Sequence, residues 1–327
     1  MRFIKRNLPA IISLVLLATA ILYLGLRHSQ FTAIAKAWGR IDAADLAGAI
    51  VLTFLAQLTI AWRCRIIYEG DGLTAASMTL ANLRIQLVSL FAGHCAIVPG
   101  FADIAKGTMV KLRYEIQIAR ALKYVVYERV CTAVGYMMVG ILAMPFFFSF
   151  RMPFWLILAP ALIWLGGGIL LAAIMFMARR PVATGKEKLD RLIGAIVRVG
   201  NLYHDPRSFA ELFLCGLAQI ALNAGTFALL AKGMALPVPP GLIYIFTPFI
   251  IFISSLPIFY MGWGGREAAV IMTLGTVAHL ATADALALSA AYGVVVFLTA
   301  LPGAVLWLLR PSMRKPMEVP LTLTTAE

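Results

Sequence analysis

Charged residues are scarce in this sequence, and acidic ones are the scarcest. Only 13% of the 327 residues are charged, 61% are hydrophobic, and the mean hydropathy is +0.89. Such a composition cannot cover a water-exposed surface. The apolar residues form continuous runs that reach the ~20 residues needed to cross a bilayer, rather than alternating as in a β-barrel strand. The sequence therefore excludes a soluble protein and predicts an all-α polytopic membrane protein.

Cysteine and histidine are also few, with four residues of each. Neither type shows the spacing of a metal site, and we expect the cysteines to be small buried hydrophobic residues. The sequence has no H-E-x-x-H, no Ser/His/Asp arrangement and no phosphate-binding loop of the G-x-x-x-x-G-K-[ST] type. We therefore expect no metal and no cofactor. The missing motifs favour a transporter over an enzyme, and any transport would draw on an ion gradient or on downhill lipid flow.

Positive charge exceeds negative charge, with 28 Lys and Arg against 15 Asp and Glu, giving a net charge of +13. In a soluble protein this balance could indicate nucleic acid. Here the basic residues lie between apolar runs, where they set the topology and meet anionic lipid headgroups. We expect the anionic cytoplasmic leaflet, and no nucleic acid, as a partner.

Six apolar runs are long enough to be full transmembrane spans. The first follows basic residues and precedes a possible signal cleavage site at Ala33-Ile34-Ala35, but it is longer than the ~7–15 apolar residues of a signal peptide, so we expect a retained helix. The six runs are Leu8–Leu26, Leu46–Ile67, Ala121–Phe148, Phe154–Ala178, Phe209–Ala231 and Ala285–Leu309.

Two further apolar stretches, about 75–112 and 240–279, are interrupted by helix-breaking residues. The first breaks at Pro99 and Gly100, and the second at Pro257, Gly262, Gly264 and Gly265. Broken backbone is tolerated at membrane depth only where it lines a cavity or packs on protein. If both stretches are re-entrant hairpins, most Lys and Arg, including Arg63 and Arg65, fall on the cytoplasmic side, as the positive-inside rule requires.

This layout predicts one transmembrane domain over residues 1–310, with both termini cytoplasmic and the hairpins entering from opposite faces. Each hairpin lies between two full spans, which is the pattern of an inverted repeat. Residues 186–203 have an apolar stripe and a basic face, so we predict an amphipathic helix on the cytoplasmic leaflet, with docking to a partner protein as the alternative. Residues 311–327 are expected to be a short disordered cytoplasmic tail.

Charged residues inside the membrane are costly, about 2.5 to 3.5 kcal/mol each on insertion scales, and are functional candidates. Arg266 and Glu267 begin a new apolar helix after the second break, and a helix N-terminus with a guanidinium suits a phosphate. The alternative is a turn capped by its own charges. In the first hairpin, an ion pair between Asp103 and Lys106 on a solvated loop is the alternative to a binding role. The predicted headgroup-binding residues are Arg84, Asp103, Lys106, Arg129, Arg266 and Glu267.

The motif Pro257-x4-Gly262-x-Gly264-x-Arg266-Glu267 resembles the signature of a flippase-like family, the transmembrane region of lysylphosphatidylglycerol synthase. Glu128-Arg129, after a Pro-Gly-x-x-Asp hairpin, is similar to an earlier motif of that family. The resemblance extends from about Leu46 to Leu309. It departs where Phe101-Ala102 leads directly to Asp103 and where Lys106 replaces an expected Arg, which leaves the headgroup preference open.

The resemblance implies a bacterial-type inner-membrane protein that handles a lipid or lipid-linked glycan. It also implies that aminoacyl transfer belongs to a separate soluble domain, which we do not find in this sequence. We therefore expect a flippase-like transporter for an anionic phospholipid or a polyprenyl-phosphate headgroup. The alternatives are an embedded transferase or hydrolase, with Asp103 or Glu267 as general base, and an accessory subunit that binds a glycosyltransferase or lipid-synthesis partner through the helix Lys186 to Tyr203.

Overall fold

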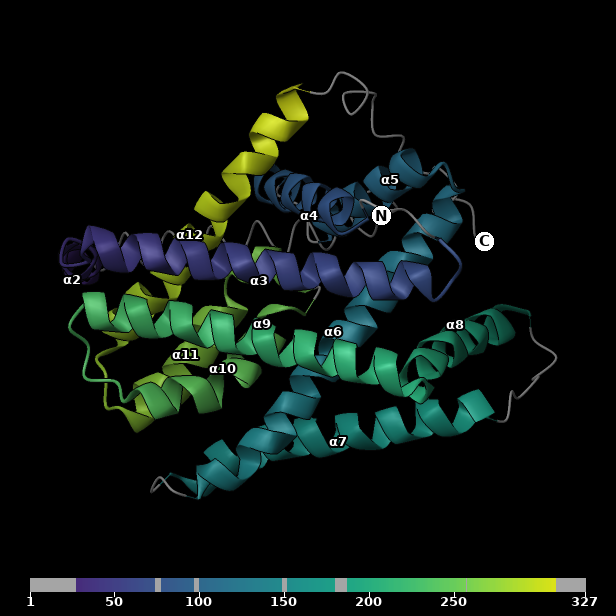
Figure 1. Ribbon diagram of the computed structural model, residues 1–327. Helices are drawn as coiled ribbons and strands as arrows, with labels where there is room; N and C mark the ends of the chain where they lie inside the picture. The colour runs from purple at the N-terminus through teal and green to yellow at the C-terminus, as the bar shows by residue number, and fades with distance from the viewer. Residues whose placement is uncertain are drawn as a thin grey trace, which may run out of the picture.

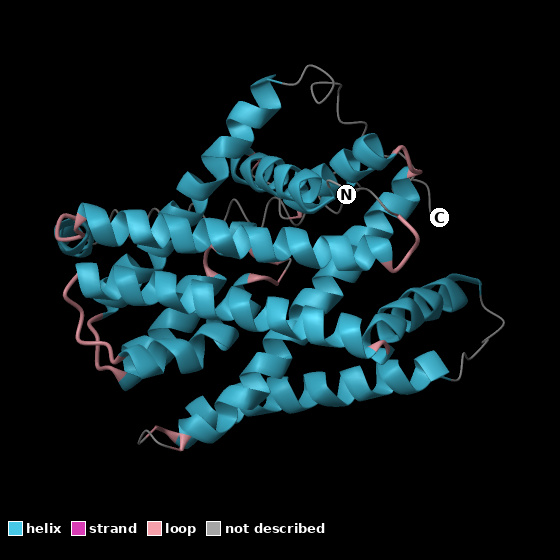
Figure 2. Ribbon diagram, viewed as in Figure 1, coloured by secondary structure: helices cyan, strands magenta, loops and turns pink. Residues whose placement is uncertain are grey.

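The helices follow the predicted apolar runs in a computed structural model that describes residues 28–73, 78–96, 100–148, 152–179, 187–256 and 258–309 (Figures 1 and 2). Within those ranges there is no β-strand. The predicted span Leu8–Leu26, the tail 311–327, Pro99 and Pro257 lie outside the described residues. The helices are α2 (His28–Trp38), α3 (Ala43–Glu69), α4 (Met78–Cys95), α5 (Phe101–Tyr114), α6 (Ile118–Phe147), α7 (Phe154–Arg179), α8 (Glu187–His204), α9 (Pro206–Gly233), α10 (Pro240–Ser254), α11 (Gly265–Val270) and α12 (Thr282–Leu309).

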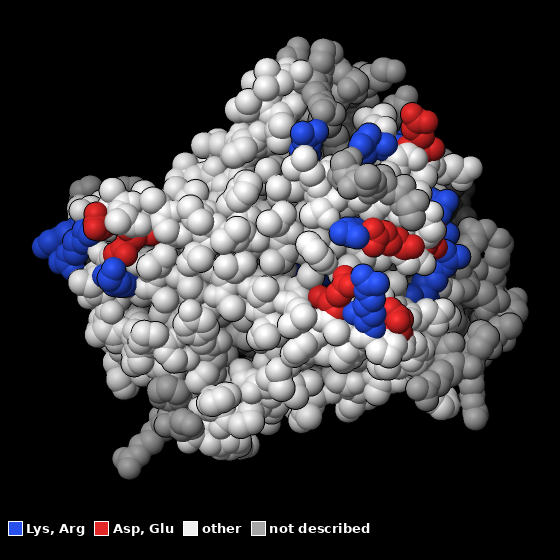
Figure 3. Space-filling model, in the orientation of Figure 1, with Lys and Arg blue, Asp and Glu red and all other residues white. Residues whose placement is uncertain are grey.

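Five of these helices are long and apolar enough to cross a membrane: α3, α6, α7, α9 and α12. Figure 3 shows how charge is distributed on one face of the molecule. The visible Lys, Arg, Asp and Glu side chains gather at two opposite ends, and the surface between them is uncharged. Such a belt matches the hydrocarbon core of a bilayer, where ionised side chains are costly. The protein is therefore an all-α, multi-pass membrane protein, as the composition predicted.

The long helices α3 and α9 run side by side through the bundle (Figure 1). Lys232 at the end of α9 donates to Asp45 at the start of α3 at 2.9 Å, and Thr53 and Thr226 hydrogen bond midway at 3.2 Å. Helix α9 also crosses α6 where Gly216 meets Gly135, and a Cβ on Gly216 would lie 3.1 Å from the Gly135 Cα. Small residues at such crossings let helix backbones approach closely, which replaces the hydrophobic effect as the source of packing in a membrane.

Helices α4 and α5 form an antiparallel hairpin. At its open end, Tyr114 donates to Asn82 at 2.9 Å and packs edge-on against Tyr68 at the end of α3. At its tip, Gly93 lies against Ala102, so closely that a Cβ on Gly93 would be 2.7 Å from that side chain. Gly100 begins the return with a positive φ of 77°, a conformation that is strained for residues with a Cβ.

Helices α10 and α11 form a second hairpin near the opposite end of the bundle. The chain leaves α10 at Ser254, makes a 3₁₀ turn at Tyr260–Gly262 and enters α11, which continues as a π-helical turn at Ile271–Gly275. Gly262 and Gly264 have positive φ values of 80° and 88°, so this break uses the predicted glycines. The start of α12, to which the hairpin returns, accepts a hydrogen bond from Trp38 of α2 at the Ala287 carbonyl.

The tips of the two hairpins meet inside the bundle. The Tyr260 hydroxyl donates to the backbone carbonyl of His94 at 2.6 Å. Met261 packs on Gly93, where a Cβ would lie 2.8 Å from the methionine sulfur. Two segments that are more than a hundred residues apart in the sequence are therefore in direct contact.

Close packing of α12 on α4 predicts that Gly303 cannot be enlarged without cost. A Cβ at Gly303 would lie 2.1 Å from the Leu87 carbonyl oxygen, which is backbone and cannot rotate away. We expect Gly303→Ala to lower the free energy of unfolding by ~1–3 kcal/mol, the usual cost of overpacking. Thermal unfolding in detergent measures this. Gly166→Ala is the matched control, because nothing lies within 4 Å of its new Cβ; equal melting temperatures for the two variants would contradict the packing described.

Candidate functional site

A cavity of about 230 Å³ lies between the two hairpins and is lined by parts of α3, α4, α5, α6, α9, α10, α11 and α12. Of the residues predicted from the sequence, it brings together Asp103, Lys106, Arg129 and Arg266, and its wall includes Gly100 and Gly262. Arg84, on α4, is not among the lining residues. The structure therefore joins the two broken segments around one space and leaves Arg84 outside it.

Lys106 lies in the wall of the cavity and is almost fully buried, with 4% of its surface exposed. Its ammonium donates to the Gln86 side chain at 2.8 Å and forms an ion pair with Glu128 on α6. Glu128 is 7% exposed. A buried charge is tolerated only when it is paired and hydrogen bonded, and each of these two groups supplies what the other needs. The alternative considered from the sequence, an ion pair between Asp103 and Lys106 on a solvated loop, is wrong, because Lys106 is buried and pairs with Glu128.

Asp103 pairs with Arg129, one residue beyond Glu128 on α6. Both Nε and Nη2 of Arg129 donate to the same carboxylate oxygen, at 3.1 and 2.6 Å. The side chain of Arg129 is 48% exposed and that of Asp103 is 29% exposed, so this pair is more open than the one made by Lys106. Adjacent residues of α6 thus bind two residues of α5 that lie three positions apart and therefore share a helix face.

Arg266 projects from the first turn of α11 and is only 3% exposed. Its guanidinium lies 4.8 Å from the Trp263 ring centre and 5.4 Å from that of Tyr292, distances at which cations are attracted to aromatic faces. Nε donates to Ser289 at 3.1 Å and Nη2 to Glu267 at 3.0 Å. No described residue accepts a hydrogen bond from Nη1, so this donor is free to meet a ligand in the cavity.

Glu267 does not line the cavity but holds Arg266 in place. One carboxylate oxygen accepts from Arg266 and from the Ser289 hydroxyl at 2.8 Å, and the other accepts from the Gly264 backbone N–H at 2.6 Å. The second bond caps the start of α11. Glu267 therefore caps the helix and orients Arg266.

Arg63 is a site residue that the sequence interpretation missed, because it was counted among the cytoplasmic charges. It lies within α3, is 1% exposed and lines the cavity. Nη1 donates to Gln219 at 2.8 Å, whereas Nε and Nη2 have no hydrogen-bond partner among the described residues, and Nη2 lies 4.0 Å from Glu128. Its position inside the apolar run Leu46–Ile67 was the available signal. Arg65, in contrast, is exposed and pairs with Glu69 at 2.7 Å.

Gly293 on α12 is a second residue that was missed. A Cβ there would lie 2.5 Å from Nη2 of Arg266 and 2.8 Å from the Trp263 ring. The absence of a side chain thus makes room for the stacked guanidinium. Nothing in the local sequence distinguishes this glycine from the others in apolar helices.

The cavity carries a net positive charge. Four cations, Arg63, Lys106, Arg129 and Arg266, line it against two carboxylates, Asp103 and Glu128. Charges interact more strongly in such an apolar setting than in water. Among the described residues there is no group of three or more His, Cys, Asp or Glu side chains that could hold a metal ion. The site is therefore suited to an anion held by side-chain donors.

Charge compensation predicts a specific pattern of stability among variants of the buried pair. Glu128→Gln leaves Lys106 and Arg63 without a counter-charge, and we expect it to cost ~3–5 kcal/mol of unfolding free energy. Lys106→Met combined with Glu128→Gln restores the original net charge of the cluster and should recover much of that loss. Thermal unfolding in detergent of the wild type, the two single variants and the double variant measures the coupling, and additive effects of the two substitutions would contradict it.

Comparison with known proteins gives one informative result. The profile of the family described as the lysylphosphatidylglycerol synthase TM region matches residues 10–303. Among curated proteins, none matches the chain. The family match covers both hairpins and every helix that contributes to the cavity, so the chain belongs to the family of the lysylphosphatidylglycerol synthase transmembrane region.

Proposed function

We propose that this protein moves a membrane lipid or lipid-linked headgroup across the bilayer, and that the cavity between the hairpins binds the anionic part of that headgroup. One observation carries the proposal: cations from both hairpins line a single cavity inside an apolar bundle. A buried excess of positive charge is costly unless an anion compensates it. A phosphodiester or polyprenyl-phosphate headgroup supplies that anion while its tails stay in the bilayer.

The layout of the hairpins supports transport rather than simple binding. The α4–α5 hairpin opens beside the end of α3, and the α10–α11 hairpin opens beside the start of α12, near the other end of the bundle (Figure 1). We propose that both are re-entrant and that they form an inverted repeat. In transporters of this kind the binding site lies near the membrane midplane, between discontinuous helices, and can be reached from each side in turn.

The free donors indicate which residues would contact the phosphate. Arg266 offers Nη1 from a fixed orientation. Arg129 of α6, which pairs with Asp103 of the first hairpin, is 48% exposed. Arginine is suited to bidentate contact with phosphate oxygens. Lys106 and Asp103 then set the local charge balance around it.

A non-enzymatic role is supported by the state of the carboxylates. Asp103, Glu128 and Glu267 each accept hydrogen bonds from a basic side chain. A carboxylate that is engaged in an ion pair is a poor general base, because proton transfer to it would break that ion pair. We also propose that the protein lies in a bacterial-type inner membrane, with the C-terminal end of α3 and the N-terminal end of α6 on the cytoplasmic side.

Arg266→Ala is the direct test. Full-length protein is reconstituted in vesicles that contain fluorescent headgroup-labelled phosphatidylglycerol, and movement between leaflets is followed by quencher accessibility. We expect transport to fall at least ~10-fold, because a hydrogen bond to a charged group contributes ~1.5–3 kcal/mol. Arg113→Ala, which removes an exposed arginine of α5 outside the cavity, is the matched control.

Wild-type transport by Arg266→Ala would overturn the assignment. Mass spectrometry of the recovered lipids tests the enzymatic alternative in the same vesicles, since a chemically altered lipid would indicate a transferase or hydrolase.

Arg84→Ala separates the sequence prediction from the geometry. Since Arg84 is not among the residues that line the cavity, we expect the variant to transport at nearly the wild-type rate in the same assay. A loss equal to that of Arg266→Ala would place Arg84 on the headgroup path despite its position.

A further inference from the structure

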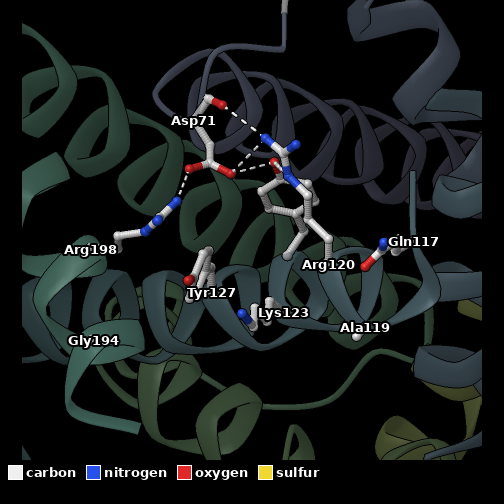
Figure 4. Close-up of a pocket in the computed structure, with 9 residues that line it drawn as sticks. Asp71, Gln117, Ala119, Arg120, Lys123, Tyr127, Gly194 and Arg198 are labelled. Carbon is white, nitrogen blue, oxygen red and sulfur yellow. Dashed lines mark hydrogen bonds and ion pairs between the residues drawn. The ribbon is translucent and has the colours of Figure 1, made fainter. Parts of the chain in front are cut away.

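A second cavity, of about 560 Å³, lies beside the end of α3 and is separate from the cavity between the hairpins (Figure 4). It is formed by the turn after α3, the first turns of α6 and one face of α8. Among the residues that the structure describes, its lining includes three cations, Arg120, Lys123 and Arg198, and one carboxylate, that of Asp71. No residue is shared between the linings of the two cavities.

Asp71 holds two of the three cations together. Its carboxylate accepts from the Tyr124 hydroxyl at 2.5 Å, from Nη2 of Arg120 at 3.2 Å and from Arg198 on α8 (Figure 4). Burial alone would raise the pKa of Asp71, but the bond from Tyr124 and the two guanidinium groups outweigh it, so the pKa is lowered. The carboxylate therefore stays ionised at neutral pH and neutralises one positive charge.

Lys123 lies across the cavity from this cluster and pairs with no described carboxylate. The N-terminus of α6 adds to the positive potential. The residue before the helix, Gln117, makes no side-chain hydrogen bond to its backbone, and the first turn contains no acidic residue. The first N–H groups of this 30-residue helix thus have no side-chain acceptor. They lie next to a cavity whose described side chains, three cations and one carboxylate, leave an excess of positive charge.

We propose that this second cavity binds a phosphate group, held by Lys123, Arg198, Arg120 and the start of α6, at a site separate from the transported headgroup. Phosphate fits because its several oxygens can accept from guanidinium, ammonium and backbone donors at once. The phosphate competes with Asp71 for Arg198 and Arg120, so its binding loosens the link between α8 and the turn after α3. The source is an anionic lipid of the adjoining leaflet or a soluble phosphate compound.

Isothermal titration of the full-length protein in detergent tests the site. The probes are water-soluble dihexanoyl phosphatidic acid and inorganic phosphate, and Arg266→Ala serves as the background so that the headgroup cavity does not contribute. We expect Lys123→Gln with Arg198→Gln to weaken phosphatidic acid binding at least ~10-fold, since each charged hydrogen bond contributes ~1.5–3 kcal/mol. Lys111→Gln with Arg113→Gln removes the same charge from α5, outside this cavity, and should leave the affinity unchanged.

Asp71→Asn gives a prediction of opposite sign. It removes the carboxylate that competes with phosphate for the arginines, so phosphate binding should tighten. If the cluster only stabilised the fold, the same substitution would weaken binding. Stronger binding of phosphatidic acid than of phosphate identifies a lipid headgroup as the ligand, and equal binding identifies a free phosphate compound. The proposal is overturned if neither probe binds, if both double variants lose affinity equally, or if Asp71→Asn weakens binding.

Discussion

The arrangement of this protein depends on how an apolar bundle accommodates ionised side chains. Glu128 lies between Lys106 of α5 and Arg63 of α3, so one carboxylate ties the first hairpin to two of the long helices. Removing one member of such a group leaves a charge that neither water nor lipid can compensate. The pairing thus fixes the position of α5, and with it one wall of the cavity between the hairpins.

The second hairpin solves the same problem in a different way. Arg266 is surrounded by two aromatic rings, a hydroxyl and the carboxylate of Glu267, and Gly293 leaves the space that the guanidinium occupies. Of these partners, only the Glu267 carboxylate carries a formal charge. The cation is therefore held in a fixed orientation without being closed off, which is what a binding group requires, since preorganised donors lose little entropy when a ligand arrives.

Much of the fold could be predicted from the sequence because hydropathy acts locally. The apolar runs gave the described spans, and Gly100, Gly262 and Gly264 marked the breaks because positive φ is a property of single residues. Pairing is not local. Lys106 has a carboxylate three residues away, yet it pairs with Glu128, and Arg63 was counted among the cytoplasmic charges although it is buried in α3. Such partners depend on how helices rotate about their axes, which hydropathy does not specify. The same reason explains why Arg84, which also lies in an apolar stretch of sequence, is not among the residues that line the cavity.

The contact between the two hairpin tips has a mechanical consequence. Because the hydroxyl of Tyr260 is bonded to the main chain of His94, neither tip can swing aside alone while that bond is intact. If the protein moves a headgroup as proposed, opening from one side requires the two tips to tilt together or requires this hydrogen bond to break first. In the second case the tyrosine hydroxyl would act as the latch between the two forms, and it would do so at the cavity wall itself, since its neighbour Met261 lines the cavity.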